Sequence, residues 1–183
     1  MHKKEEIAIV LEFLPNGYSY DTRPSHKKTA IAQALGKERF TILELAPKKD
    51  VFLNIGQEVY IGEGKRDDIH HILGKLPYDK LTSTARTNLE YSVEEMITQN
   101  EKKFVDFFNI AQPMTTRMHQ LELLPGLGKK HMQAILEARD EKPFESFEDL
   151  KTRVHLMPDP KTAIKKRILN ELEGLEKHKV FVD

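Results

Sequence analysis

The sequence predicts an α+β protein with two domains, a small β-barrel in residues 1–76 and an all-α domain in residues 77–183. Before Pro77, short apolar stretches are separated by turn signals, and this spacing is typical of short strands. After Pro77, apolar residues recur at every third or fourth position, which is the period of a helix. A chain of 183 residues is long enough for one domain or two small ones.

Strands in the first part are indicated by alternating apolar side chains. The predicted strands cover residues 7–13, 40–45, 58–62 and 69–73, and the segment 29–36 fits a strand or a helix by pattern alone. Turn signals lie at residues 15–17 and 47–50. Several short strands in a row predict a small closed barrel, and the phrase at 55–61 is typical of OB-like barrels.

Helices in the second part are indicated by periodicity and by capping residues. One helix face is formed by residues four apart, Leu81, Ala85, Leu89, Val93 and Ile97. Asn100 is a cap for a second helix, which Pro113 ends because the residue before a proline avoids the α region. Thr115 or Thr116 then caps a third predicted helix, which runs to Leu123.

Composition excludes several classes of protein. The absence of cysteine excludes disulfides, thiolate zinc sites, iron–sulfur clusters and a cysteine nucleophile. The 29 basic and 29 acidic residues cancel, which argues against a polycation that grips nucleic acid along its whole length. A charged N-terminus without a following apolar run predicts no signal peptide, and no stretch is long enough for a membrane span. We therefore expect a cytoplasmic protein.

The strongest local signal is a glycine-rich turn between two predicted helices, within residues 121–136. The first amides of the second helix lack intrahelical partners and carry the positive end of the helix dipole, so they can hold a phosphate. This stretch resembles the helix-hairpin-helix motif, whose members grip the sugar-phosphate backbone without reading bases. The alternative is a tight interhelical turn without a ligand. The predicted phosphate-binding residues are Pro125, Gly126, Leu127, Gly128, Lys129 and Lys130.

A second hairpin is predicted farther along, which makes the helix-hairpin-helix region, about residues 115–175, a tandem repeat. The phrase at 143–150 resembles the element that follows the first hairpin in tandem domains, and Ser146 with Asp149 forms a capping box. The second turn, at residues 155–160, lacks the two glycines, and we expect it to keep the fold without the amide cradle. Asp159 followed by Pro160 is a good helix start.

Basic residues after the first hairpin predict an auxiliary patch. A local patch, rather than net charge, is the electrostatic footprint of a nucleic-acid binder on a neutral protein. The equal alternative is a solvated helix face, because periodicity does not place these charges on one side. The residues of the predicted patch are Arg117, Lys151, Arg153, Lys161, Lys165, Lys166 and Arg167.

Two loops of the predicted barrel combine cations with aromatic residues or glycines. Aromatic rings beside cations suit single-stranded nucleic acid, and barrels of this kind bind through such loops. The alternative is a pair of ordinary surface loops. The candidate contacts are Tyr18, Tyr20, Arg23, Lys27, Lys28, Lys65 and Arg66.

Nearly the whole chain resembles the DUF655 family of uncharacterised archaeal proteins. The resemblance rests on phrases at residues 11–15, 31–36, 58–62, 81–85, 115–126 and 143–149. It implies an N-terminal β-barrel domain joined to a helical domain that contains the hairpin. It also implies an RNA-binding protein, whose gene is expected to lie among those for translation and rRNA modification.

The sequence thus predicts a non-catalytic nucleic-acid binder, with rRNA or tRNA preferred over DNA, no membrane partner and a monomeric state. No cofactor or metal is expected, since the adjacent His70 and His71 point to opposite faces of a strand. The alternative is an adaptor for the ribosome or RNA polymerase whose hairpin is only structural. A remote alternative is a DNA glycosylase-like enzyme, with Lys130 in the hairpin and Glu148 or Asp149 about one helix later.

Overall fold

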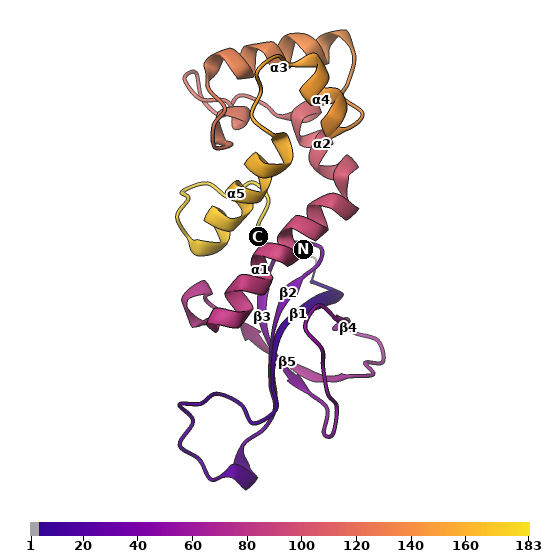
Figure 1. The fold of residues 1–183 in the computed structure, drawn as a ribbon, viewed down its shortest axis with the longest axis vertical. Coiled ribbons are helices and arrows are strands. Elements are labelled where there is room, and N and C mark those ends of the chain that lie inside the picture. The colour runs from indigo at the N-terminus through magenta and orange to yellow at the C-terminus, as the bar shows by residue number, and fades with distance from the viewer. Residues whose placement is uncertain (1–3) are drawn as a thin grey trace. The chain divides into compact units, whose positions relative to one another are not determined.

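A computed structural model describes residues 4–183, and these form two compact units (Figure 1). The first unit contains Met1–Val93 and Glu171–Asp183, and the second is the contiguous segment Glu94–Asn170. The division therefore falls inside two helices, α1 (Ser83–Gln99) and α5 (Pro160–Glu173). Whether residues 1–76 and 77–183 are separate domains stays a prediction.

The first unit is built on an antiparallel sheet of five strands. These are β1 (Ile7–Leu14), β2 (Ile31–Gly36), β3 (Ile42–Pro47), β4 (Glu58–Tyr60) and β5 (Ile69–Lys75). Their order is β4-β1-β2-β3-β5. The segment 29–36, which fitted two conformations by pattern, forms β2.

The predicted closed barrel is wrong in one respect, because the curled sheet is a half-barrel. The two edge strands, β4 and β5, do not pair with each other among residues 4–183. Irregularities between Val10 and Glu12 and between Glu44 and Leu45 break the register, and such bulges bend a strand and increase its twist. With only three residues in β4, the curl does not close.

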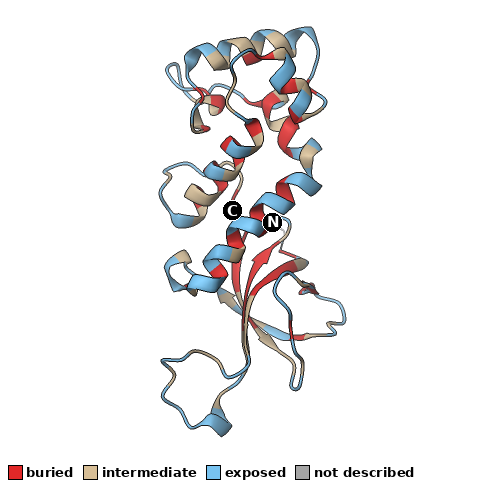
Figure 2. Cartoon of the chain, viewed as in Figure 1, coloured by how far each residue is buried: buried red, intermediate tan, exposed pale blue. Residues whose placement is uncertain are grey.

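The core of the first unit uses both faces of the central strands. One face holds a cluster of ten buried residues, Ala8, Val10, Ala32, Ala34, Leu43, Leu45, Leu53, Val59, Ile61 and Ile69. The alternate residues Ile9, Leu11 and Leu35 are buried too, which explains why β1 reads as a nearly continuous apolar run (Figure 2). Asn88 on α1 donates a 3.0 Å hydrogen bond to the Leu11 carbonyl and ties this helix to the sheet.

Residues 171–183 complete the first unit. The Glu171 carboxylate accepts hydrogen bonds from the amides of Val180 (2.7 Å), Phe181 (3.1 Å) and Val182 (3.2 Å). Arg39, beside the β2–β3 turn, forms an ion pair with Asp183. Glu171 and Val182 are both buried, so this segment belongs to the folded unit.

The second unit contains α2 (Glu101–Ile110), α3 (Lys129–Glu141), α4 (Phe147–Arg153) and the adjoining parts of α1 and α5. The predicted helix starts at Ser146 and Asp159 are confirmed, but only half of the predicted capping box forms, because the Asp149 carboxylate accepts the Glu145 amide and not the Ser146 amide. Ser146 accepts a 2.9 Å bond from the Asp149 amide, and Asp159 accepts a 3.1 Å bond from the Thr162 amide. Asn100 lies at the start of α2, but its side chain donates to the Met96 carbonyl instead of capping.

The predicted third helix, capped by Thr115 or Thr116, is wrong. The segment before the hairpin holds only a 3-10 turn, η3 (Gln120–Leu123). Thr115 uses its hydroxyl to accept the amides of Arg117 and Met118, which closes a turn where a helix would have to begin. Within residues 4–183, no helix is both long and apolar enough to cross a membrane.

Candidate nucleic-acid interface

The predicted hairpin is a tight turn between η3 and α3. Gly126 has a φ of +84°, a left-handed conformation that costs a residue with a side chain roughly 1–2 kcal/mol. The Leu127 amide donates a 3.2 Å bond to the Leu124 carbonyl, and the Leu127 side chain is only 6% exposed. The turn therefore folds around a buried leucine.

Beyond the turn, the first amides of α3 face outward. The first intrahelical bond of this helix runs from the Met132 amide to the Gly128 carbonyl at 3.0 Å. In the part of the chain that the structure describes, the amides of Lys129 and Lys130 have no hydrogen-bond partner. Two amides at the positive end of a helix thus remain able to donate to an anion.

The amide just before these two, that of Gly128, donates to the side chain of His131. Its Nδ1 accepts a 3.3 Å bond from the Gly128 amide, and its Nε2 lies 3.2 Å from the Leu156 carbonyl of the second turn. The imidazole therefore connects the two turns. No spacing rule for histidine ligands points to this contact, so sequence reasoning missed it.

The two hairpin lysines differ in what they contact. The Lys129 ammonium lies 3.4 Å from the Glu122 carboxylate and 3.4 Å from the Arg117 carbonyl. Lys130 is exposed, and its ammonium makes no hydrogen bond or ion pair within residues 4–183. Lys130 is therefore the cation that stays available beside the outward amides.

His119 and Glu122 order the chain just before the turn. His119 is buried, and its Nδ1 accepts a 3.1 Å bond from the Leu121 amide. Burial, together with the charge of Arg139, lowers the pKa of His119. The Glu122 carboxylate accepts a 2.8 Å bond from the His119 amide, and this bond together with Lys129 lowers the pKa of Glu122. His119 therefore caps the 3-10 turn and packs inside the fold.

Two members of the predicted auxiliary patch are held inside the fold. Arg153 donates to the carbonyls of Ala138 (2.6 Å) and Lys142 (2.7 Å) and lies over the Phe144 ring. Arg167 is 3% exposed and donates to the Leu123 carbonyl at 3.1 Å. Both arginines therefore bind backbone carbonyls of this unit.

The remaining members of the patch lie at the surface. Lys151 is within 3.8 Å of Glu148 and of Asp159, while Lys161 and Lys165 both pair with Glu94. Lys166 and Arg117 are exposed. A role of these residues in binding stays a prediction.

The second turn does not repeat the first. Leu156 has a φ of +56° and is 81% exposed, whereas its counterpart Leu127 is buried. Pro158 contacts the first turn instead, since its Cγ would lie 3.4 Å from a Cβ built on Gly126. This turn supports the first hairpin through packing.

The candidate barrel contacts belong to the other compact unit. Tyr18 and Tyr20 stack on each other, and Arg23 forms an ion pair with Asp21 at 2.7 Å. Arg66 donates a 2.8 Å bond to the Gly62 carbonyl, and Lys65 is exposed. Lys27 is exposed, and Lys28 is half-buried.

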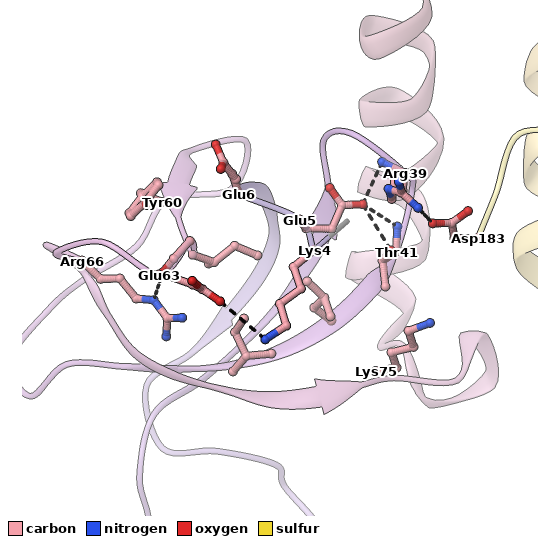
Figure 3. Close-up of a pocket in the computed structure, with 14 residues that line it drawn as sticks. Lys4, Glu5, Glu6, Arg39, Thr41, Tyr60, Glu63, Arg66, Lys75 and Asp183 are labelled. Carbon is pink, nitrogen blue, oxygen red and sulfur yellow. Dashed lines mark hydrogen bonds and ion pairs between the residues drawn. The ribbon is translucent and has the colours of Figure 1, made fainter. Parts of the chain in front are cut away.

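A hollow of about 930 Å³, which no sequence pattern predicted, lies in the unit that contains the sheet (Figure 3). Its apolar lining includes Leu43, Ile61 and Ile72. Four basic and four acidic side chains line it, and two ion pairs form among them, with Lys4 at 3.7 Å from Glu63 and Arg39 beside Asp183. Because basic and acidic side chains are balanced, the lining of the hollow does not favour binding of an anion.

Glu5, which also lines the hollow, serves the fold. Its carboxylate accepts bonds from the amides of Glu38 (2.8 Å) and Arg39 (2.7 Å) and from the Thr41 hydroxyl (3.1 Å). Among residues 4–183 there is also no group of three or more histidine and acidic side chains that could hold a metal ion.

Comparison with known proteins gives three matches. A family model described as a protein of unknown function, DUF655, matches residues 4–183. The uncharacterized protein MJ0038 of Methanocaldococcus jannaschii is 43% identical over 180 residues, which cover 98% of this chain and 80% of the relative. The crystal structure of Af1531 from Archaeoglobus fulgidus, which carries the same family model, is 46% identical with a TM-score of 0.89, and the match covers 98% of this chain and all of that one.

Proposed function

The chain belongs to the DUF655 family, and on that premise we propose that it is a non-catalytic, cytoplasmic nucleic-acid-binding protein that grips a phosphate backbone through a helix-hairpin-helix. The observation that carries the proposal is the start of α3. There, two outward amides without partners lie beside the exposed Lys130, after a turn built on Gly126 and the buried Leu127.

The chemistry of this site fits a phosphate diester. Amides at a helix N-terminus point their hydrogens at an anion without reading the base, and a lysine adds a point charge. A lysine in the first turn opposes the helix dipole, so its position costs helix stability unless an anion is bound nearby. Binding of this kind is tolerant of sequence and weakens with salt.

RNA is the polymer we propose, with rRNA or tRNA as the class and translation as the setting. The support is the family resemblance described above. The hairpin itself contacts phosphate, which RNA and DNA share, so both polymers belong in the test.

The experiment is fluorescence anisotropy with labelled RNA and DNA at about 50 and about 200 mM salt, comparing wild type with Lys130→Glu. We expect the variant to bind about tenfold more weakly at low salt. The slope of log affinity against log salt concentration should fall by about one, which corresponds to one lost phosphate contact. The matched control is Lys102→Glu, an exposed lysine on α2 of the same unit, which should leave the affinity unchanged.

Two outcomes would refute the proposal. One is a wild-type protein that binds neither polymer at low salt. The other is an equal loss of affinity in the Lys130 and Lys102 variants, because the effect would then come from overall charge and not from the hairpin.

The second candidate function is a protein-interaction adaptor of the ribosome or RNA polymerase with a structural hairpin. Two contacts favour it, because His131 already occupies the Gly128 amide and Glu122 already pairs with Lys129. An adaptor would keep its protein partner in the Lys130→Glu variant. Pull-down with wild type and variant, followed by identification of the captured chains, separates the two functions.

A glycosylase-like activity receives no support from the side chains around the hairpin. Asp149 accepts the Glu145 amide at 3.0 Å and pairs with Arg153 at 3.2 Å, and these two contacts together lower the pKa of Asp149. It is thus engaged in ordering the start of α4, and we propose no reaction.

A further inference from the structure

The loop after β1 contains an anchored tyrosine. The Tyr18 hydroxyl donates to the Glu44 carboxylate and accepts a 3.2 Å bond from the side chain of Gln33. Gln33 is completely buried, donates to the Lys80 carbonyl at 3.1 Å and accepts the Thr82 amide at 3.0 Å. The Tyr18 ring is therefore fixed to β2, to β3 and to the segment before α1.

The fixed ring supports a second, exposed one. The rings of Tyr18 and Tyr20 are nearly parallel, with an angle of 7° between planes and 5.0 Å between centroids. Tyr20 is 73% exposed, whereas the large aromatic side chain of a tyrosine usually buries most of its surface. An aromatic ring held in a parallel stack with an exposed end offers a flat surface to a further ring at little cost in side-chain entropy.

Two lysines in the same loop, unpaired among the described residues, favour an anionic ligand. Arg23 is neutralised by Asp21, to which its guanidinium donates three hydrogen bonds of 2.7–3.1 Å. Lys27 and Lys28 follow in the same loop, and within residues 4–183 neither forms an ion pair. A nucleotide with an unpaired base combines a flat ring with a negative charge.

We propose that Tyr20 is a stacking platform for an unpaired base of a single-stranded nucleic acid, with Lys27 and Lys28 beside the neighbouring phosphates. This inference rests on the proposed function and adds the class of substrate. The hairpin binds the backbone of any strand, whereas an exposed aromatic ring requires a base that is free of its partner.

The chain offers a direct signal for this contact. It contains five tyrosines and no tryptophan, so its intrinsic fluorescence comes from tyrosine alone. A base stacked on Tyr20 quenches that emission. The experiment titrates the full chain with a labelled single-stranded RNA decamer, an abasic decamer of the same length and an RNA duplex, and follows anisotropy and tyrosine emission.

Three variants test whether the Tyr20 ring contributes to binding. Tyr20→Ala should bind the base-bearing single strand about 5- to 150-fold more weakly, which is the range for loss of one base–aromatic stack. Tyr20→Phe should retain wild-type affinity, because the ring remains. Tyr91→Ala, at an exposed tyrosine on α1 of the same unit, should also retain it. The abasic strand and the duplex should bind wild type and Tyr20→Ala equally well.

The outcomes separate the two proposals. Wild-type affinity of Tyr20→Ala for the base-bearing strand, or an equal loss on the abasic strand, would overturn the stacking platform. If Lys130→Glu still weakens binding in that case, the hairpin proposal survives alone. If the wild-type protein binds none of the three probes, both proposals are wrong.

Discussion

The Glu5 carboxylate inside the β2–β3 turn gives a quantitative prediction for stability. It accepts the amides of Glu38 and Arg39 and the hydroxyl of Thr41, and the residue is 7% exposed. Hydrogen bonds to a charged group contribute about 1.5–3 kcal/mol each, and water replaces part of the loss at the more exposed amides. Glu5→Ala should therefore lower the free energy of unfolding by about 2–4 kcal/mol.

Gly36 makes the prediction sharper, because its missing side chain leaves room for Glu5. A Cβ built on Gly36 would overlap the Glu5 carboxyl group. The carboxylate cannot move aside without breaking the bonds described above, so Gly36→Ala should cost about 1–3 kcal/mol. In a chain that already carries Glu5→Ala the overlap is gone. The double variant should thus be about 1–2 kcal/mol more stable than the sum of the single effects predicts.

Tyrosine fluorescence during urea unfolding is the assay. All five tyrosines, at positions 18, 20, 60, 78 and 91, belong to the first unit, so the signal reports the unit that contains the turn. Additive effects, within about 0.5 kcal/mol, would refute the claim that Glu5 and Gly36 share one space. A Glu5→Ala variant as stable as wild type would refute the role of the carboxylate.

Two further predictions concern the second unit. Because the pKa of His119 is lowered from 6.5 and its neutral Nδ1 accepts the Leu121 amide, its contribution to stability is complete above about pH 6.5 and is lost as the pH falls. NMR titration of the His119 ring should give a midpoint below pH 6.5, and a midpoint above 6.5 would contradict the burial argument. His119→Asn keeps a capping side chain but does not titrate in this range. Its free energy of unfolding in urea, followed by circular dichroism, should therefore depend less on pH than that of wild type. Arg153→Ala should lower the free energy of unfolding by about 1–3 kcal/mol, because it removes the guanidinium that donates to the Ala138 and Lys142 carbonyls at the end of α3, while its RNA affinity in anisotropy should match wild type. A stable Arg153→Ala protein with weakened RNA binding would instead assign this arginine to the basic patch.

Local sequence signals predicted most of the elements. Alternation identified β1 and β3, and the four-residue period identified α1, whose Ala85, Leu89 and Val93 are all buried. Capping chemistry located the starts of α4 and α5. These signals succeed because each depends on residues only a few positions apart.

The failures come from contacts between residues far apart or from competing local bonds. Thr115 has the chemistry of a helix cap, but a turn of its own uses the hydroxyl. Closure of a barrel depends on whether β4 and β5 meet, which neither strand encodes alone. Arg153 and Arg167 look like surface cations in the sequence, and only the fold shows the carbonyls that they bind.

The contribution of residues 171–183 to the first unit has a consequence for the order in which the chain folds during translation. Glu173 is hydrogen-bonded to Tyr78, and Asp183 is paired with Arg39, so the two parts of this unit are synthesised on either side of the segment Glu94–Asn170. That segment leaves the ribosome as one uninterrupted piece and can fold as soon as it emerges. The strands of the first unit, by contrast, complete their contacts only after residues 171–183 have followed the inserted segment.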